Sequence, residues 1–231
     1  LAKSMEEELG ITFTVSSEDG CLKIAASGEN GHASTPWKGK NALTGLLALI
    51  ERLPLAECGQ LKAVRALNHL MPHGDWFGAG LGIQISDEES GELTLAFSML
   101  DISEKSLEGE FDSRCPICAT KENTIDVIRK NMEAEGISFN TEELEPPHHV
   151  PADSDFVKTL LSAYESYSGR KGECIAIGGG TYVHHLKNGV AFGACLPETE
   201  NHMHGPDEFA VVDELLMSAK IFAQVIVDLC S

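Results

Sequence analysis

Two short stretches near the start of the chain alternate apolar and polar residues. One covers residues 11–15, the other covers residues 22–26, and the turn Glu18-Asp19-Gly20 lies between them. Strict alternation is typical of a half-buried β-strand, because successive side chains point to opposite faces of a sheet. The pattern therefore predicts an antiparallel β-hairpin.

Helical spacing replaces this alternation after Asn41. Apolar residues then follow one helix face until Pro54 ends the run, and a second helix is predicted at about residues 59–70. A second alternating pair covers residues 81–86 and 92–100. The further elements predicted before residue 145 are a strand at 109–114, a helix from about 120 to 135 and a short strand at 137–139.

The composition changes at residues 145–151, where Glu-Pro-Pro-His-His-Val-Pro favours a domain boundary. We therefore expect one domain over residues 1–148 and a second over 149–231. The alternation of helices and strands indicates an α+β sandwich. The elements predicted after the boundary are a helix capped by Asp153 and ending near 167, a buried strand at 173–177, a tight turn at 178–181, a strand at 189–195 and an amphipathic helix at 212–229.

The net charge of the chain argues against some classes of binding partner. The 231 residues include 17 Lys and Arg against 36 Asp and Glu, which gives a formal net charge of −19. This balance opposes binding to nucleic acid or to an anionic membrane surface, because both need a local positive field. No apolar run approaches the roughly 18 to 20 residues of a membrane-spanning helix.

The cysteines indicate a cellular location, and the first residues of the chain indicate whether it is part of a longer polypeptide. The seven cysteines are an odd number in apolar contexts, which predicts reduced, buried thiols and a cytoplasmic location. The chain opens on Leu1 without an initiator Met or a signal-peptide pattern, so we expect it to be part of a longer polypeptide.

Three polar segments carry candidate chemistry, and each also has a plain structural interpretation. Residues 31–36 read Gly-His-Ala-Ser-Thr-Pro, which also suits helix capping by Ser34 or Thr35. The glycine triplet at 178–180 suits either close approach to an anion or a simple turn. The loop at 200–209 holds two histidines and several acids, which suits either a metal ligand or a surface pair.

Other metal-like patterns are rejected at this point. His73-Gly74-Asp75 follows a predicted helix rather than an apolar strand, and Asp87-Glu88-Glu89-Ser90 occupies a hairpin turn where such residues are common. Cys115 and Cys118 form a lone C-x-x-C pair, without the second pair of a tetrahedral thiolate site. A small zinc domain built on these two cysteines is the weakest of the alternatives.

In chain order, these motifs resemble those of PepV-type zinc dipeptidases. That family belongs to the wider superfamily of carnosinases, acetylornithine deacetylase and succinyl-diaminopimelate desuccinylase, and the similarity covers essentially the whole chain. The matching segments are Gly31-His32-Ala33-Ser34-Thr35-Pro36 with 39–42, Arg114 before Pro116, residues 147–151, residues 177–182, residues 191–193, and Met203-His204 before Asp207-Glu208-Phe209.

The resemblance implies an enzyme with two zinc ions that hydrolyses dipeptides or similar small peptides. It implies a lid domain over residues 1–148, built as a ferredoxin-like sandwich of antiparallel sheet and helices, and then the C-terminal part of an α/β catalytic domain. The implied roles are His204 as a zinc ligand, His32 as the lid donor to the oxyanion, Arg114 as the partner of the substrate carboxylate, and Gly179, Gly180 and Thr181 as the loop that holds the same end of the substrate.

Part of the family pattern is missing. The remaining zinc ligands and the glutamate base of the family precede the lid, and no such set precedes His32. His184 also stands where relatives often carry Arg. We therefore expect this chain alone to be inactive. We also expect it either to self-associate through uncovered apolar surface or to be a piece trimmed from a larger fold. The alternative is a non-catalytic dimerisation or peptide-binding module derived from the lid fold.

Overall fold

The computed structural model describes residues 1–193, 195–203 and 206–231. The chain divides into two compact units. The first consists of Leu1–Pro147 with Ala176–Gly179, and the second of His148–Ile175 with Gly180–Ser231. The interpretation of these units as lid and catalytic segment stays a prediction.

The predicted hairpin is confirmed in the first unit. Strands β1 (Thr12–Glu18) and β2 (Cys21–Ser27) pair antiparallel, with Glu18 opposite Cys21. Asp19 and Gly20 have φ values of 51° and 80°, the left-handed geometry of a two-residue hairpin turn whose twist matches the strands.

A second long hairpin differs from the expected pairing. Strand β5 (Thr94–Ile102) pairs with β6 (Leu107–Arg114), whereas residues 81–85 form no strand. Gly82 has a φ of 79°, which interrupts an extended conformation. Only the two-residue strands β3 (Ser86–Asp87) and β4 (Gly91–Glu92) pair there.

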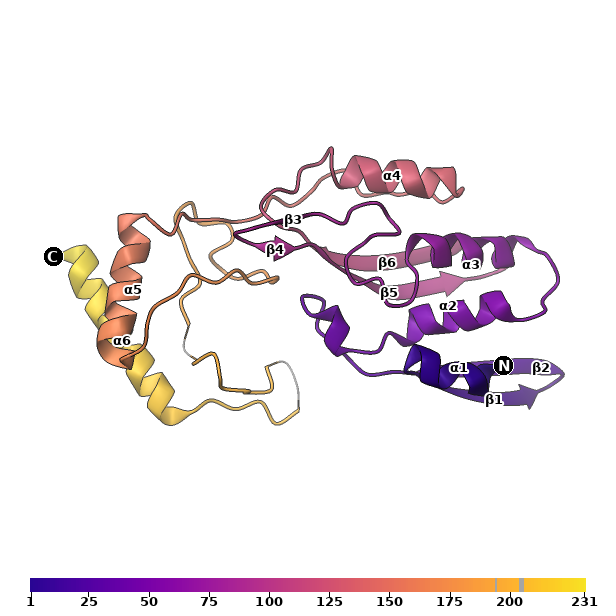
Figure 1. Ribbon diagram of the computed structural model, residues 1–231, viewed down its shortest axis with the longest axis horizontal. Coiled ribbons are helices and arrows are strands. Elements are labelled where there is room, and N and C mark those ends of the chain that lie inside the picture. The colour runs from indigo at the N-terminus through magenta and orange to yellow at the C-terminus, as the bar shows by residue number, and fades with distance from the viewer. Residues whose placement is uncertain (194, 204–205) are drawn as a thin grey trace. The chain divides into compact units, whose positions relative to one another are not determined.

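Helices cover these hairpins, which confirms the α+β class. Helices α2 (Ala42–Arg52) and α3 (Gly59–Leu70) match the predicted ranges, and Figure 1 shows them side by side. Helix α4 (Ile125–Ala134) begins later than the predicted start at about residue 120. The Asn41 side chain caps α2 by accepting from the Thr44 N–H at 3.1 Å. Helix α1 (Ala2–Leu9) was not predicted.

The first unit has two apolar clusters. One joins α2, α3, α4 and β5, and the other joins α1, β1 and α2. Helix α2 belongs to both, through Leu47 on one side and Leu49 on the other. The predicted strand at 137–139 does not form; Phe139 instead stacks on Phe111 of β6, with ring centroids 5.8 Å apart.

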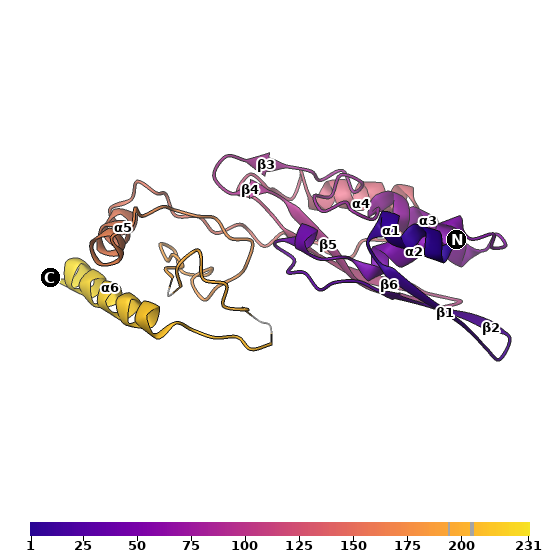
Figure 2. The same cartoon turned by 60° about the horizontal axis from the view of Figure 1, so that its bottom comes forward.

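The second unit is built on two helices, α5 (Asp155–Ser168) and α6 (Val212–Cys230), which pack side by side (Figure 2). Ser154, and not the predicted Asp153, caps α5 by accepting from the Val157 N–H. The buried residues between the helices are Leu160, Ala163, Ile221 and Val225.

Two predicted strands are wrong in this part of the chain. Residues 173–177 and the described part of 189–195 are not strand; Ala194 lies outside the described residues. A strand is stable only beside a neighbour that completes its hydrogen-bond ladder, and the described residues of the second unit supply helices and loops. No helix in the described parts of the chain is long and apolar enough to cross a membrane.

Candidate functional site

His32 lies in the loop between β2 and the short 3-10 helix η1 (Pro36–Lys38). Its Nδ1 atom is 2.7 Å from the Ser34 hydroxyl and accepts the Ser34 backbone N–H at 3.2 Å. Thr35 occupies the N-cap position of η1 without a side-chain cap bond, and Pro36 is its first residue. The Ser34 hydroxyl therefore contacts the histidine, and neither candidate hydroxyl caps the helix.

A cavity of about 340 Å³ lies elsewhere in the first unit, and a smaller one of about 240 Å³ is lined by Arg114 but by no other described residue of the predicted site. This smaller cavity, which we call the Arg114 cavity, draws on segments far apart in the sequence. Its lining includes Ser34, Trp37, Phe77, Arg114, Ile177 and Gly178.

Gly178, the first glycine of the glycine-rich turn, belongs to the first unit and packs against two other segments of that unit. A Cβ atom at this position would lie 2.8 Å from Ser34 Cβ and 3.4 Å from Arg114 Cβ. The first distance is shorter than packed carbon atoms allow, so only glycine fits without movement. The segments that hold Ser34, Arg114 and Gly178, all of them in the first unit, therefore meet at one point.

Arg114 ends β6 and already holds a carboxylate. Its Nε lies 2.7 Å from Asp112 Oδ1, and its Nη2 donates to Asp112 Oδ2 at 2.8 Å. The two residues share a strand face because they are two apart. A substrate carboxylate would have to use the remaining N–H groups of the guanidinium or displace Asp112.

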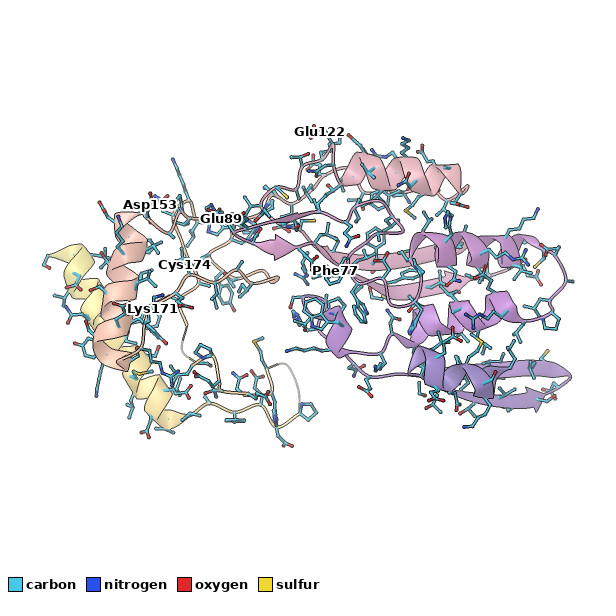
Figure 3. The ribbon with its side chains drawn as sticks, viewed as in Figure 1. Phe77, Glu89, Glu122, Asp153, Lys171 and Cys174 are labelled. Atoms are coloured by element: carbon cyan, nitrogen blue, oxygen red, sulfur yellow. The ribbon has the colours of Figure 1, made fainter. Side chains whose placement is uncertain are left out.

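Two aromatic rings line the same cavity. Trp37 and Phe77 have ring centroids 5.8 Å apart, and Trp37 is 41% exposed. Phe77, labelled in Figure 3, comes from the loop between α3 and β3. Neither these two aromatic residues nor Asp112 was predicted from the sequence as part of the site. The two-residue spacing of Asp112 and Arg114 on a predicted strand could have indicated that their side chains lie on one face.

The remaining residues of the predicted site, Gly179, Gly180, Thr181 and His204, have fewer described contacts than His32 and Arg114. Gly179 ends the segment that belongs to the first unit, whereas Gly180 and Thr181 belong to the second. Apart from its chain neighbours, no described residue has an atom within 4 Å of a Cβ built on Gly179 or Gly180. The Thr181 carbonyl accepts from the His184 N–H in a turn. The predicted zinc ligand His204 lies outside the described residues.

The rejected metal patterns have structural roles. His73 contacts the Thr44 hydroxyl at 2.8 Å through Nδ1 and the Leu9 carbonyl at 2.9 Å through Nε2. Asp75 accepts three backbone N–H groups, from Phe77, Ala79 and Gly80. Among residues 1–193, 195–203 and 206–231, no group of three or more His, Cys, Asp or Glu could hold a metal ion.

Asp87 organises its turn in the same way. Backbone N–H groups of Ser90, Cys118 and Glu89 donate to its carboxylate. These bonds, the one from Ser90 foremost, lower the pKa of Asp87 from 3.8 to about 2. Asp87 is therefore a structural residue of this turn, as its position in a hairpin suggests.

The cysteines differ in part from expectation. All seven are free thiols, but six are exposed and Cys115 is half-buried, so the predicted burial is wrong. Several lie at turns and element ends, such as Cys21 at a hairpin turn and Cys58 before α3. Desolvation raises the pKa of Cys115 and of Cys118, which opposes the thiolate form that zinc binds.

Comparison with known proteins gives a consistent result. Residues 6–228 match the model of "Peptidase family M20/M25/M40". The chain is 36% identical over 213 residues to the Bacillus subtilis (strain 168) protein named "Putative dipeptidase YtjP". It is 32% identical over 226 residues to the "Beta-Ala-Xaa dipeptidase" of Lactobacillus delbrueckii subsp. lactis.

These matches cover nearly all of this chain but only part of each relative. They span 92% and 97% of the chain, against 45% and 47% of the two relatives. The chain therefore spans about half the length of the curated relatives that it matches.

Proposed function

The chain belongs to peptidase family M20/M25/M40, and from this premise we propose that the whole protein hydrolyses dipeptides. The relatives named as dipeptidases support the substrate class. The observation that carries the proposal is the contact of Ser34 and Arg114 with Gly178, because it joins the His32 loop to a guanidinium that suits a carboxylate.

In this proposal His32 and Arg114 act on different parts of one substrate. Arg114, with the turn of Gly179, Gly180 and Thr181, binds the free carboxylate of the dipeptide. His32 donates a hydrogen bond to the oxygen of the peptide carbonyl as that oxygen becomes an oxyanion. A preorganised donor of this kind contributes roughly 10²- to 10³-fold in turnover.

Two zinc ions belong to the proposal for the whole protein, with His204 as one ligand. The described residues contain no cluster that could hold a metal ion, so they do not by themselves form the site. The other ligands would come from sequence beyond this chain. We expect the chain alone to be inactive for this reason.

A cytoplasmic location is part of the same proposal. It rests on the cysteines, which are free thiols and mostly exposed, since exposed thiols persist in a reducing compartment.

The alternative is a non-catalytic dimerisation or peptide-binding module derived from the lid fold, and the one observation that suits such a module lies outside the lid, in the second unit. Helix α6 exposes large apolar side chains, which suit contact with another polypeptide. The exposed members are Val212, Leu215, Leu216, Phe222, Ile226, Val227 and Leu229.

The test measures zinc content and dipeptide hydrolysis of the whole protein and of this chain, side by side. We expect zinc and activity only in the whole protein. His204→Ala should lower metal occupancy, whereas His32→Ala should lower turnover and keep the metal. A whole protein that folds correctly but is inactive and metal-free would contradict the enzyme proposal and favour the binding module.

A further inference from the structure

The Ser34 backbone N–H determines which nitrogen of His32 carries the proton. It donates to Nδ1 at 3.2 Å, so Nδ1 is an acceptor without a hydrogen. A neutral imidazole has one protonated nitrogen, which must then be Nε2. The Ser34 hydroxyl, 2.7 Å from the same Nδ1, can donate to it as well.

The backbone around this contact is held from two further sides. The buried Thr94 hydroxyl of β5 donates to the Ala33 carbonyl at 2.9 Å, and the Thr35 N–H donates to the His32 carbonyl at 2.9 Å. Ser34 Cβ also lies against Gly178. Because residue 34 is fixed by its neighbours, its two contacts with the imidazole are preorganised rather than formed on demand.

We infer that Ser34 is a positioning residue that fixes His32 as the Nε2–H tautomer and directs this N–H donor toward the substrate oxyanion. The inference rests on the proposed function for the identity of the acceptor. The tautomer itself follows from the contacts at Nδ1 alone. Ser34 acts through His32 and needs no contact with the substrate.

The first test reads the tautomer directly. Nitrogen-15 NMR of the imidazole of His32, recorded on this chain above the titration range of histidine, distinguishes a protonated from an unprotonated ring nitrogen. We expect a protonated Nε2 and an unprotonated Nδ1. A proton on Nδ1 in the wild-type chain would overturn the inference without any variant.

Substitutions then separate positioning from a general structural role. Ser34→Ala should move the two ring-nitrogen signals toward each other, because the remaining backbone bond alone holds the tautomer less firmly. Ser34→Thr, which keeps the hydroxyl, should restore the wild-type signals. Thr35→Ala is the matched control, since the Thr35 side chain makes no cap bond, and it should leave the His32 signals unchanged.

Turnover of the whole protein gives the functional readout. Ser34→Ala should lower kcat roughly 2- to 10-fold with little change in KM, as expected for loss of one hydrogen bond, and Ser34→Thr should restore kcat. Unchanged ring signals and unchanged kcat in Ser34→Ala would overturn the inference. If the ring signals of Ser34→Ala move but His32→Gln has wild-type turnover, the proposed catalytic role of His32 is wrong. The contact of Ser34 with Nδ1 would then fix the tautomer without affecting catalysis.

Discussion

The two units of the chain differ in how completely they bury their own apolar residues. In the first unit, α2 places Leu47 in one cluster and Leu49 in another, and both side chains are almost fully buried. In the second unit, the 19-residue α6 buries only Ser218, Ile221 and Val225. Apolar residues are abundant in both, so the difference lies in the partners that each unit provides.

This difference bears directly on the site. His32 and Arg114 belong to the unit that completes its own core, and their loops are held by contacts within it. Thr181 belongs to the unit that leaves apolar surface exposed, and His204 lies outside the described residues. The described structure therefore organises the two residues of the proposed site that belong to the first unit, His32 and Arg114.

The largest expected effect is a difference in stability between truncating a buried leucine in the first unit and truncating an exposed leucine in the second. Leu49→Ala should destabilise the first unit by about 2–5 kcal/mol, because Leu49 is completely buried and its truncation leaves a cavity. Leu216→Ala on α6, where the side chain is 57% exposed, should change stability by less than about 0.5 kcal/mol. Denaturant-dependent hydrogen exchange of amides in α2 and α6 measures both. Equal losses would contradict the comparison.

The next effect concerns residues 176–179, which belong to the first unit although they follow residues of the second unit in sequence. Gly178→Ala should cost about 1–3 kcal/mol, because the new Cβ overpacks against Ser34. Gly179→Ala is the matched variant, since its Cβ meets open space.

Protection of residues 176–179 against limited proteolysis, together with the NMR signals of Ser34, reports whether this segment stays in place. Displacement in Gly179→Ala but not in Gly178→Ala would show that the contact with Ser34 is not what holds the segment.

A smaller effect is expected from the exposed face of α6. Leu215 and Ile226 are eleven residues apart, which is three helical turns, so they lie on one face. We propose that this face drives self-association, and the double variant Leu215→Asp with Ile226→Asp should weaken it at least about tenfold, or about 1.4 kcal/mol.

Sedimentation of the chain at several concentrations measures the association. Val15→Asp with Leu22→Asp is the control in the first unit, where both side chains are exposed on the hairpin. A wild-type chain that remains monomeric at high concentration would contradict the proposal.

The smallest effect is a pH dependence within the first unit. Because the pKa of Asp87 is lowered from 3.8 to about 2, its carboxylate stabilises the fold above pH 4, and this contribution is lost as the pH falls toward 2. Asp87→Asn should therefore lower the Tm above pH 4, and the difference from wild type should shrink toward pH 2.

Glu88→Gln removes the same charge from the same turn and serves as the control for Asp87→Asn. Thermal melts of wild type and both variants between pH 2 and 6 test this. A Tm difference that stays constant over the whole range would contradict the role of the backbone bonds to Asp87.

Local signals in the sequence predicted some elements of the first unit, whereas α1 was missed and the strand at 137–139 was wrong. The turn at Asp19-Gly20 gave the position of the β1–β2 hairpin, and the helical spacing from Asn41 to the Pro54 stop gave that of α2. Residues 173–177 carried an equally apolar pattern, yet no strand forms there. A strand depends on a neighbour that can lie anywhere in the chain or beyond it, and a local pattern contains no information about that neighbour.

The candidate site shows the same division. The resemblance gave His32 and Arg114, but their immediate contacts, Ser34 at Nδ1 and Asp112 at the guanidinium, came from the structure. In the sequence, capping by Ser34 or Thr35 is one of two interpretations of this segment, because a Ser or Thr before Pro suits a helix start. Its contact with the Gly178 segment joins residues more than 140 positions apart, which no local pattern predicts.

The central claim is that the first unit supplies the donor that stabilises the oxyanion during dipeptide hydrolysis. The most direct test compares kcat of wild type and His32→Gln in the whole protein, with metal content measured on the same samples. The account predicts a loss of roughly 10²- to 10³-fold with unchanged metal content. Equal turnover of the two proteins at equal metal content would contradict it.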